Sequence, residues 1–199
     1  MHTLKAAILT AALVVAAPTA LSAQQDSRPL GVAQAASSAI MEALLADVEQ
    51  VEQKMIALAE AIPQEAYDWR PGAGVRSVGE VMRHVAADNW FLPTFVDVAA
   101  PASTGITASS YPSVQAYEAR ELDQAATIAE LRVSFEHLKR VMREVDESEL
   151  AGTVTLFGME MTGLRLWVLT VTHLHEHLGQ SIAYARSNGV VPPWSRASE

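Results

Sequence analysis

The sequence predicts an all-α protein, a four-helix bundle, and three observations indicate this fold class. Half of the 199 residues are hydrophobic but only 6% are aromatic, a balance that suits helices better than a β-sandwich. Apolar residues recur at helical spacing in four long segments. Alternation typical of strands is confined to one short stretch before the last of these segments. A chain of this length can bury a substantial core as one domain.

The first two helices are separated by a loop that contains proline and glycine. The first helix is expected near 32–61, because apolar side chains recur there at steps of three and four residues and Pro63 then ends the pattern. The second helix is expected near 78–98. Ser77 and Glu80 fit a capping box at its start, in which each side chain satisfies a backbone amide of the other residue.

A long link joins the second helix to the third. Pro93 falls inside the second helix and predicts a kink or an early end there. Residues 99–124 are expected to be irregular, with one short helix over 114–122. The third helix is expected near 128–145, opened by a capping box at Thr127. The length of the link leaves room for a long crossover rather than a tight antiparallel turn.

The last part of the chain predicts a short hairpin or extended segment and then the fourth helix. The hairpin or extended segment is expected at 152–163, where apolar and polar residues alternate. The fourth helix follows near 164–186. Asn188 and Gly189, with two prolines close behind them, are typical of a helix C-terminus. The four helices together form one bundle domain at 32–199.

Residues 1–23 have the composition of a secretory signal peptide. One Lys precedes an apolar run that ends in a proline and small residues, and the run is short for a membrane span. Residues 24–31 would then be a polar tether. We therefore expect an exported protein, periplasmic or extracellular, that is not attached to a membrane after cleavage. An uncleaved membrane anchor is the alternative.

Charge and cysteine content narrow the range of ligands. The net charge is −9, so the chain lacks the basic surface that nucleic acids require, and we expect no nucleic-acid partner. Because the chain has no cysteine, a metal ion can be held only by nitrogen and oxygen atoms. We expect a small-molecule substrate as the partner, and the sequence leaves open whether the protein forms a homodimer.

Three of the six histidines lie within THLHEHLGQ at 172–180. His173 and His177 are four residues apart, so on a helix they share one face and can bind one divalent ion together. His175 is rotated by roughly 200° from His173 and points elsewhere. The zinc-peptidase motif requires Glu directly after the first histidine of such a pair, and it is excluded because Leu174 stands there.

A third histidine ligand has to come from another helix. His84 lies on the core-facing stripe of the second helix, where a histidine needs a hydrogen-bond partner or a metal ion. His137 stands among charged residues and is expected at the solvated flank of the third helix. His2 belongs to the signal segment. The alternative to a metal ligand at His84 is a core histidine satisfied by Asp88 or by a carbonyl group.

Two stretches of the sequence, and the order of the pieces between them, resemble the DinB/YfiT-like family, whose members are described as metal-dependent enzymes. The stretches are YDWRPGAGVRSVGEVMRHVAADNW at 67–90 and THLHEHLGQSIAYARSNGVVPPW at 172–194. In that family a WRP-type loop leads into a helix with one metal-binding histidine, and a later H-x-x-x-H-x-G-Q helix supplies two more. The resemblance implies a metal site formed by His84, His173 and His177.

The resemblance also implies chemistry. Characterised members transfer low-molecular-weight thiols to electrophiles or isomerise small acids with a thiol cofactor. An exported protein is remote from the cytosolic thiol pool, so metal-dependent hydrolysis of a small substrate is the variant that we weigh against thiol transfer. Nitrogen ligands suit Zn²⁺ or Ni²⁺, and three of them leave positions for water or substrate. Glu80, Asp88 and Gln180 are candidates to orient an imidazole, move a proton or hydrogen-bond the open site.

Two other interpretations compete with a metal-dependent enzyme. A non-catalytic metal-binding protein of the cell envelope, for storage, buffering or sensing, would share the three histidines but would need no substrate cavity. A helical interaction module would leave His84 away from His173 and His177. The space beside the histidines distinguishes the enzyme from the storage protein, since a walled pocket that solvent can reach favours an enzyme.

Overall fold

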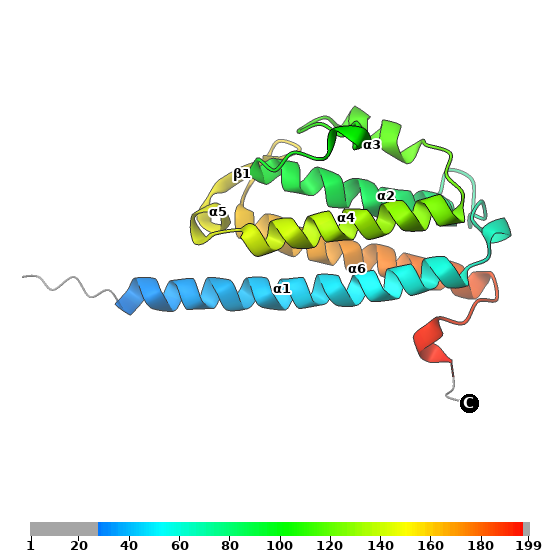
Figure 1. Ribbon diagram of the computed structural model, residues 1–199, viewed down its shortest axis with the longest axis horizontal. Helices are drawn as coiled ribbons and strands as arrows, with labels where there is room; N and C mark the ends of the chain where they lie inside the picture. Colours follow the sequence, from blue (N-terminus) through cyan, green and yellow to red (C-terminus); the bar gives the residue numbers. More distant parts are fainter. Residues whose placement is uncertain (1–27, 197–199) are drawn as a thin grey trace, which may run out of the picture.

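Four long helices lie side by side and bury their apolar faces against one another (Figure 1). The computed structural model describes residues 28–196. The helices are α1 (Arg28–Ala61), α2 (Val78–Phe91), α4 (Gln124–Glu144) and α6 (Gly163–Ser187). The prediction of an all-α protein built as a four-helix bundle is therefore confirmed.

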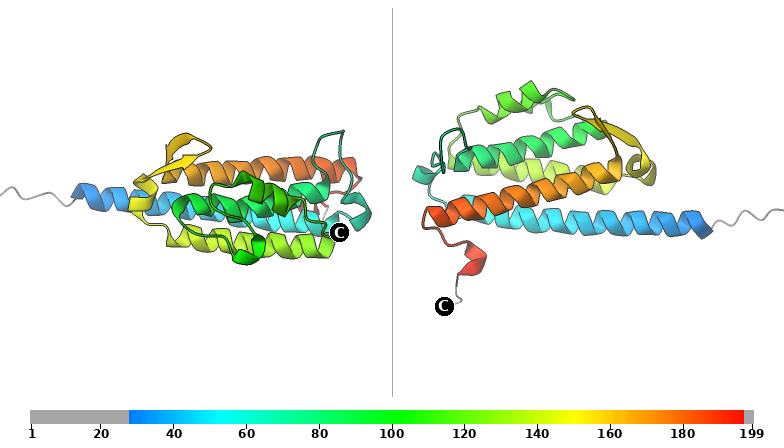
Figure 2. Two further views of the ribbon diagram at one scale, coloured as in Figure 1. Left: turned by 90° about the horizontal axis from the view of Figure 1, so that it is seen from above. Right: turned by 180° about the vertical axis from the view of Figure 1, so that it is seen from behind.

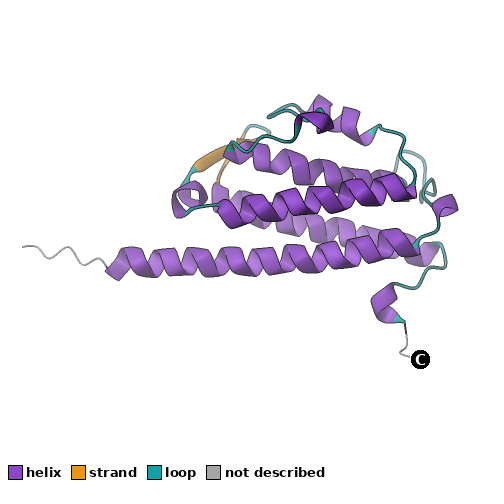
Figure 3. Ribbon diagram, viewed as in Figure 1, coloured by secondary structure: helices purple, strands orange, loops and turns teal. Residues whose placement is uncertain are grey.

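Short elements occupy the links between these helices (Figure 3). Within the described residues, the only sheet is a two-stranded hairpin. In chain order, with η for a 3₁₀ helix, the short elements are η1 (Gln64–Ala66), η2 (Leu92–Val96), η3 (Ala102–Thr104), α3 (Tyr111–Glu118), α5 (Glu147–Ala151), β1 (Thr153–Leu156), β2 (Met159–Thr162) and η4 (Pro193–Ser195).

The first helix, α1, begins earlier than expected, and its N-terminal end extends past the rest of the bundle (Figures 1 and 2). It starts at Arg28, inside the predicted 24–31 tether, because the segment that follows is rich in alanine and Pro29 is tolerated in a first turn. The predicted signal peptide at 1–23 lies outside the described residues. Among the helices from Arg28 onwards, none combines the length and the apolar character needed to cross a lipid bilayer.

The second helix, α2, starts where the sequence predicts and ends early. The Ser77 hydroxyl accepts a hydrogen bond from the Glu80 amide at 3.3 Å, and the Glu80 carboxylate accepts one from the Ser77 amide at 2.6 Å. This is the expected capping box. The α-helix stops at Phe91, and Pro93, which has no amide hydrogen to donate, lies in the tighter turn of η2.

The third long helix, α4, begins before the predicted position, so the capping box at Thr127 is wrong. The helix starts at Gln124, and the Asp123 carboxylate caps it by accepting a hydrogen bond from the Ala126 amide at 2.7 Å. The Gln124 side chain also donates to the Ala59 carbonyl at 2.9 Å, which ties the start of α4 to the end of α1. These contacts fix the start one turn earlier, and Thr127 is buried inside the helix.

The two short helices also differ from the expectation. The helix α3 begins before the expected 114–122 segment, because Pro112 is suited to the first turn of a helix and not to its interior. The helix α5 has no counterpart among the expected elements. It is stabilised by a capping box between Asp146 and Glu149, and it is too short to show an apolar period.

The segment at 152–163 forms the hairpin, one of its two predicted forms. The strands β1 and β2 pair antiparallel, with Thr153 opposite Thr162. Val154 and Leu156 point into a small apolar cluster with residues of η2 and α6. The hairpin therefore closes the end of the bundle at which α2 finishes and α6 begins.

The last helix, α6, ends at the residues that the sequence identifies and starts at a cap that it does not identify. The Thr162 side chain caps its start by accepting a hydrogen bond from the Arg165 amide at 3.2 Å. At the other end Asn188 is the C-cap, and Gly189 has a positive φ of 74°. A left-handed residue after a helix is the conformation that glycine adopts most readily.

The helix α2 is enclosed by its neighbours. It contacts α3, α4 and α6, while α1 packs on α4 and α6 (Figures 1 and 2). Nearly all residues of α2 are buried, and His84 and Asp88 are among them. Because a buried polar group without a hydrogen-bond partner is costly, both side chains must be satisfied by residues of the surrounding helices.

The expectation that His137 lies on a solvated flank is wrong. Its side chain is only 6% exposed and its ring packs against Trp90, with ring centroids 4.8 Å apart. Its Nδ1 accepts a hydrogen bond from Arg140 at 3.0 Å. The cause is the width of the interface between α4 and α2, which covers more of α4 than its apolar stripe. Burial, followed by the charge of Arg140, lowers the pKa of His137.

A pair of glycines in α6 tests this packing. The first residue of the helix, Gly163, lies so close to α5 that a Cβ atom there would overlap the Glu149 carbonyl oxygen, whereas a Cβ at Gly179 would meet open space. We expect Gly163→Ala to lower the free energy of unfolding by about 1–3 kcal/mol, as overpacking does. Gly179→Ala should raise it by up to about 1 kcal/mol, because alanine is the better helix former. Urea denaturation of both variants measures the difference, and equal effects would contradict the described contact.

Candidate metal centre

Three histidines from two helices converge at one point in the bundle. His84 comes from α2, and His173 and His177 come from successive turns of α6. Each offers one ring nitrogen, and these three atoms lie within 4.8 Å of one another. The structure thus brings His84, from the core-facing stripe of α2, together with the pair that helical spacing places on one face of α6.

The Nε2 atoms form the inner side of this cluster. Nε2 of His177 lies 3.2 Å from Nε2 of His173. Ligand atoms at 2.0–2.1 Å from a tetrahedral zinc ion are about 3.3–3.4 Å apart, so this separation is compatible with a shared ion. Nε2 of His84 faces the same region, since it lies 3.3 Å from the Asp88 carboxylate that also contacts His173.

Two of the outward-facing Nδ1 atoms have hydrogen-bond partners. Nδ1 of His84 lies 2.7 Å from a carboxylate oxygen of Glu118, and Nδ1 of His177 lies 2.9 Å from Oε1 of Gln180. Because both oxygens accept hydrogen bonds, the proton of each ring belongs on Nδ1. The Nε2 lone pairs then face inward, which is the arrangement that metal-binding histidines use.

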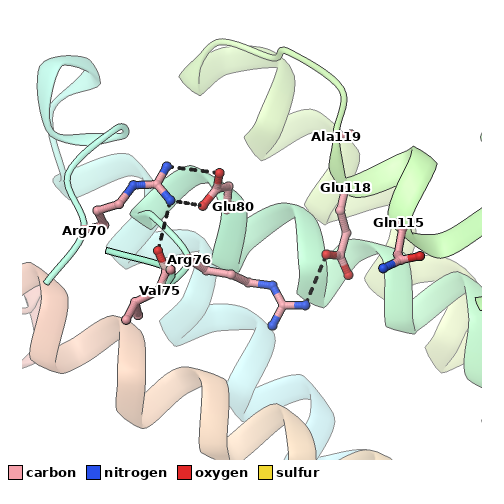
Figure 4. Close-up of a pocket in the computed structure, with 8 residues that line it drawn as sticks. Arg70, Val75, Arg76, Glu80, Gln115, Glu118 and Ala119 are labelled. Carbon is pink, nitrogen blue, oxygen red and sulfur yellow. Dashed lines mark hydrogen bonds and ion pairs between the residues drawn. The ribbon is translucent and has the colours of Figure 1, made fainter. Parts of the chain in front are cut away.

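Glu118 is the site residue that the sequence analysis misses. It ends α3, and its second carboxylate oxygen accepts a hydrogen bond from Arg76 at 3.2 Å (Figure 4). Burial alone would raise the pKa of this carboxyl group, but the contacts with His84 and Arg76 together lower it below its usual range. The residue lies in a link without periodicity, so no spacing relates it to His84.

Asp88 is the hydrogen-bond partner of two site histidines. One of its carboxylate oxygens lies 2.7 Å from Nε2 of His173 and 3.3 Å from Nε2 of His84. The hydrogen bond to Asp88, opposed in part by burial, raises the pKa of His173. A metal ion at the cluster would take the place of the proton that His173 shares with Asp88.

The third histidine, His177, is held in its neutral form. Burial, together with the charges of His84 and His173, lowers its pKa to about 4, although the hydrogen bond to Gln180 acts in the opposite direction. The Gln180 side chain is fixed in turn, because its amide donates to the Tyr184 hydroxyl at 2.9 Å. A neutral imidazole is the form that a metal ion requires.

Two other polar residues that the sequence analysis considered, Glu80 and His175, lie away from the histidine cluster. In the described contacts, Glu80 pairs with Arg70 at 3.0 Å and caps α2 through Ser77, and it does not reach the histidines. His175 is exposed on the opposite side of α6 from His173 and His177. Asp88 and Gln180 are therefore the two predicted polar partners that the structure places beside the cluster.

Two hollows border the cluster, and they differ in chemistry. A cavity of about 280 Å³ is lined by His84, Asp88 and His173 and by apolar side chains. A second hollow, of about 350 Å³, is lined by Glu118 with Arg70, Arg76 and Glu80 and, among the described residues, by no histidine (Figure 4). Arginines in the second hollow already pair with acidic side chains, as Arg76 does with Glu118. Of these two hollows, only the first has histidines among the described residues that line it, namely His84 and His173.

Comparison with known proteins identifies the family. The sequence profile of the DinB superfamily matches residues 47–181, which is more than half of the chain. The protein therefore belongs to the DinB superfamily. A search of curated proteins gave no match.

Three solved structures illustrate the shared fold at low sequence identity. The DinB-like protein YjoA from Bacillus subtilis is 17% identical, with a TM-score of 0.57 and coverage of 74% of this chain and 92% of that one. A DinB-like protein from Bacillus cereus is 13% identical, with a TM-score of 0.62 and coverage of 76% and 95%. YfiT from Bacillus subtilis, described as a probable metal-dependent hydrolase with an unusual four-helix bundle topology, is 15% identical, with a TM-score of 0.61 and coverage of 76% and 89%.

The contact between Glu118 and His84 gives a test of the cluster. We expect Glu118→Gln to weaken the binding of a divalent ion by about tenfold, because the partner of a ligating histidine orients the ring and raises its basicity. Glu121→Gln is the matched control, since Glu121 is an exposed acidic residue in the same link. Competition titration with a zinc chelator measures both affinities. Unchanged affinity in Glu118→Gln would show that this contact does not support the metal ion.

Proposed function

We propose that this protein is a metal-dependent enzyme that hydrolyses a small molecule, and that His84, His173 and His177 hold its metal ion. The observation that carries the proposal is that the three imidazoles converge beside a cavity rather than inside a sealed core. A storage or sensing protein would share the ligands but would need no such cavity. A site that combines convergent polar groups with an apolar pocket is typical of an enzyme.

The donor set suits a catalytic ion. Three imidazoles leave at least one coordination position for water or substrate, whereas structural zinc sites use four protein ligands. Imidazole donors suit Zn²⁺, Ni²⁺ and Cu²⁺, and of these we propose Zn²⁺ or Ni²⁺. When bound, such an ion would polarise a substrate oxygen and lower the pKa of a water molecule. In the chain itself, Glu118 and Gln180 orient two of the imidazoles through Nδ1.

Hydrolysis is favoured over thiol transfer by two considerations. YfiT, which has the same fold, is described as a probable metal-dependent hydrolase. In addition, residues 1–23 have the composition of a signal peptide, and an exported enzyme would work where reduced thiols are scarce. We therefore propose that the protein acts outside the cytoplasm on a substrate that requires no thiol cofactor.

The export proposal has a direct test. Fractionation of the native host should find the protein outside the cytoplasm and shortened at its N-terminus by about two dozen residues, which is a usual length for a signal peptide. N-terminal sequencing of the recovered protein locates the cleavage site. Recovery from the cytoplasm with Met1 or His2 at its terminus would overturn the proposal.

The metal proposal predicts a pattern among four histidine variants. Replacing His84, His173 or His177 by Ala should remove most of the bound metal, because two imidazoles alone rarely retain a divalent ion. Replacing His175 by Ala, on the same helix but on its exposed side, should leave the metal content nearly unchanged. Elemental analysis of protein purified without added metal or a histidine tag measures the content.

Circular dichroism of each variant shows whether the bundle is intact, so that loss of metal is not confused with loss of fold. Full metal content in His84→Ala would refute the three-histidine site. Equal loss in His175→Ala would show that the site lies on another face of α6.

A further inference from the structure

The cavity beside the histidines has a polar end and an apolar end. His84, Asp88 and His173 line the polar end. The other lining residues are apolar or aromatic and come from η2, α2, α3, α6 and the hairpin. Apart from the aromatic pair at its mouth, these residues are Phe91, Leu92, Leu156, Met159 and Leu169.

Besides Met159 of β2, the exposed lining residues that mark the mouth of the cavity are Phe157, in the turn of the hairpin, and Tyr111, at the start of α3. Their ring centroids are 5.8 Å apart in an edge-to-face arrangement. The Phe157 ring also lies 6.2 Å from that of Phe91, which belongs to the wall. Even so, the Phe157 side chain is 63% exposed, which is unusual for a large apolar residue.

The backbone conformation of this turn does not favour an aromatic residue, so the geometry of the hairpin does not explain why Phe157 is there. Phe157 and Gly158 have φ values of 50° and 80°, as in a type I′ turn. Asparagine and glycine adopt such positive φ values most readily, whereas a bulky residue is strained there. The strained conformation places an exposed phenyl ring at the mouth of a cavity, where a ligand could cover it.

The charges at the cavity indicate what kind of ligand fits. Among the described residues that line it, the titratable ones are Asp88, the two histidines at the polar end and Tyr111 at the mouth, and none is Lys or Arg. A charged group at the apolar end would therefore lose its hydration without gaining a partner. A volume of about 280 Å³ is at the small end of ligand pockets and suits one ring or a short branched chain.

From these observations we propose that the substrate carries an uncharged aryl or branched-alkyl group, which occupies the apolar end of the cavity under Phe157 while its reacting polar group faces the histidines. This inference rests on the proposed metal-dependent function and adds the substrate class to it. Phe157 is then a residue that determines specificity by contact with the hydrocarbon group.

Two hydroxamates test the substrate class, because both bind a divalent ion through the same group and differ only in the hydrocarbon. The cobalt-loaded protein is titrated with acetohydroxamate and with benzohydroxamate, and the visible spectrum of Co²⁺ reports binding. The ratio of the two affinities is compared with the ratio for the free ion in solution. We expect the protein to favour benzohydroxamate by at least about tenfold more than the free ion does, since the phenyl ring is removed from water.

The variant Phe157→Asn removes the ring and creates an Asn-Gly turn, which is well suited to the positive φ values. We expect thermal stability equal to or above that of the unmodified protein, together with a loss of most of the preference for benzohydroxamate. Trp194→Ala is the control, because Trp194 is also an exposed aromatic residue but lies in η4, away from the cavity. The control should keep the preference.

The possible failures of the two proposals are distinguishable. If cobalt binds and both hydroxamates show the ratio of the free ion, the substrate class is wrong and the metal site stands. A preference that is unchanged in Phe157→Asn would also overturn the role of the hairpin turn. If the protein binds no cobalt, the metal-dependent function fails and the substrate proposal fails with it.

Discussion

The burial of polar side chains on α2 is the constraint on which the site depends. His84 and Asp88 lie one turn apart on a helix that is enclosed on most sides, so their polar atoms must be satisfied by neighbouring helices. The α6 helix provides His173 as a partner of Asp88, and α3 provides Glu118 as a partner of His84. The same contacts that remove the cost of burial bring three imidazoles to one point.

The polar partners divide into two sets with different consequences. Glu118 and Gln180 contact the outward Nδ1 atoms of His84 and His177 and hold their Nε2 atoms toward the cluster. Asp88 contacts the inward side, next to the cavity. The hairpin and α3 line the cavity on this side of the cluster with apolar and aromatic residues. A ligand that enters this largely hydrophobic cavity reaches His84 and His173, which is the basis for proposing a substrate with an uncharged hydrocarbon group.

The sequence could predict what repeats along one helix, but not what depends on contacts between distant segments. Apolar periodicity located all four helices, and a spacing of four residues placed His173 and His177 on one face. The contact of Glu118 depends on how a nonperiodic link folds across α2, which no local pattern encodes. The expectation for His137 was wrong for a related reason, since the width of an interface between two helices cannot be read from one of them. The strained position of Phe157 likewise follows from the register of the hairpin.

Anomalous X-ray diffraction at the absorption edge of zinc tests the central claim most directly, because it locates the ion independently of any activity. Crystals would be grown from tag-free protein that has been incubated with Zn²⁺. The account predicts an anomalous peak about 2.0–2.1 Å from Nε2 of His84, His173 and His177, with Glu118 still in contact with Nδ1 of His84. Crystals with no peak at the cluster, or with an ion bound elsewhere while His173 keeps its hydrogen bond to Asp88, would contradict it.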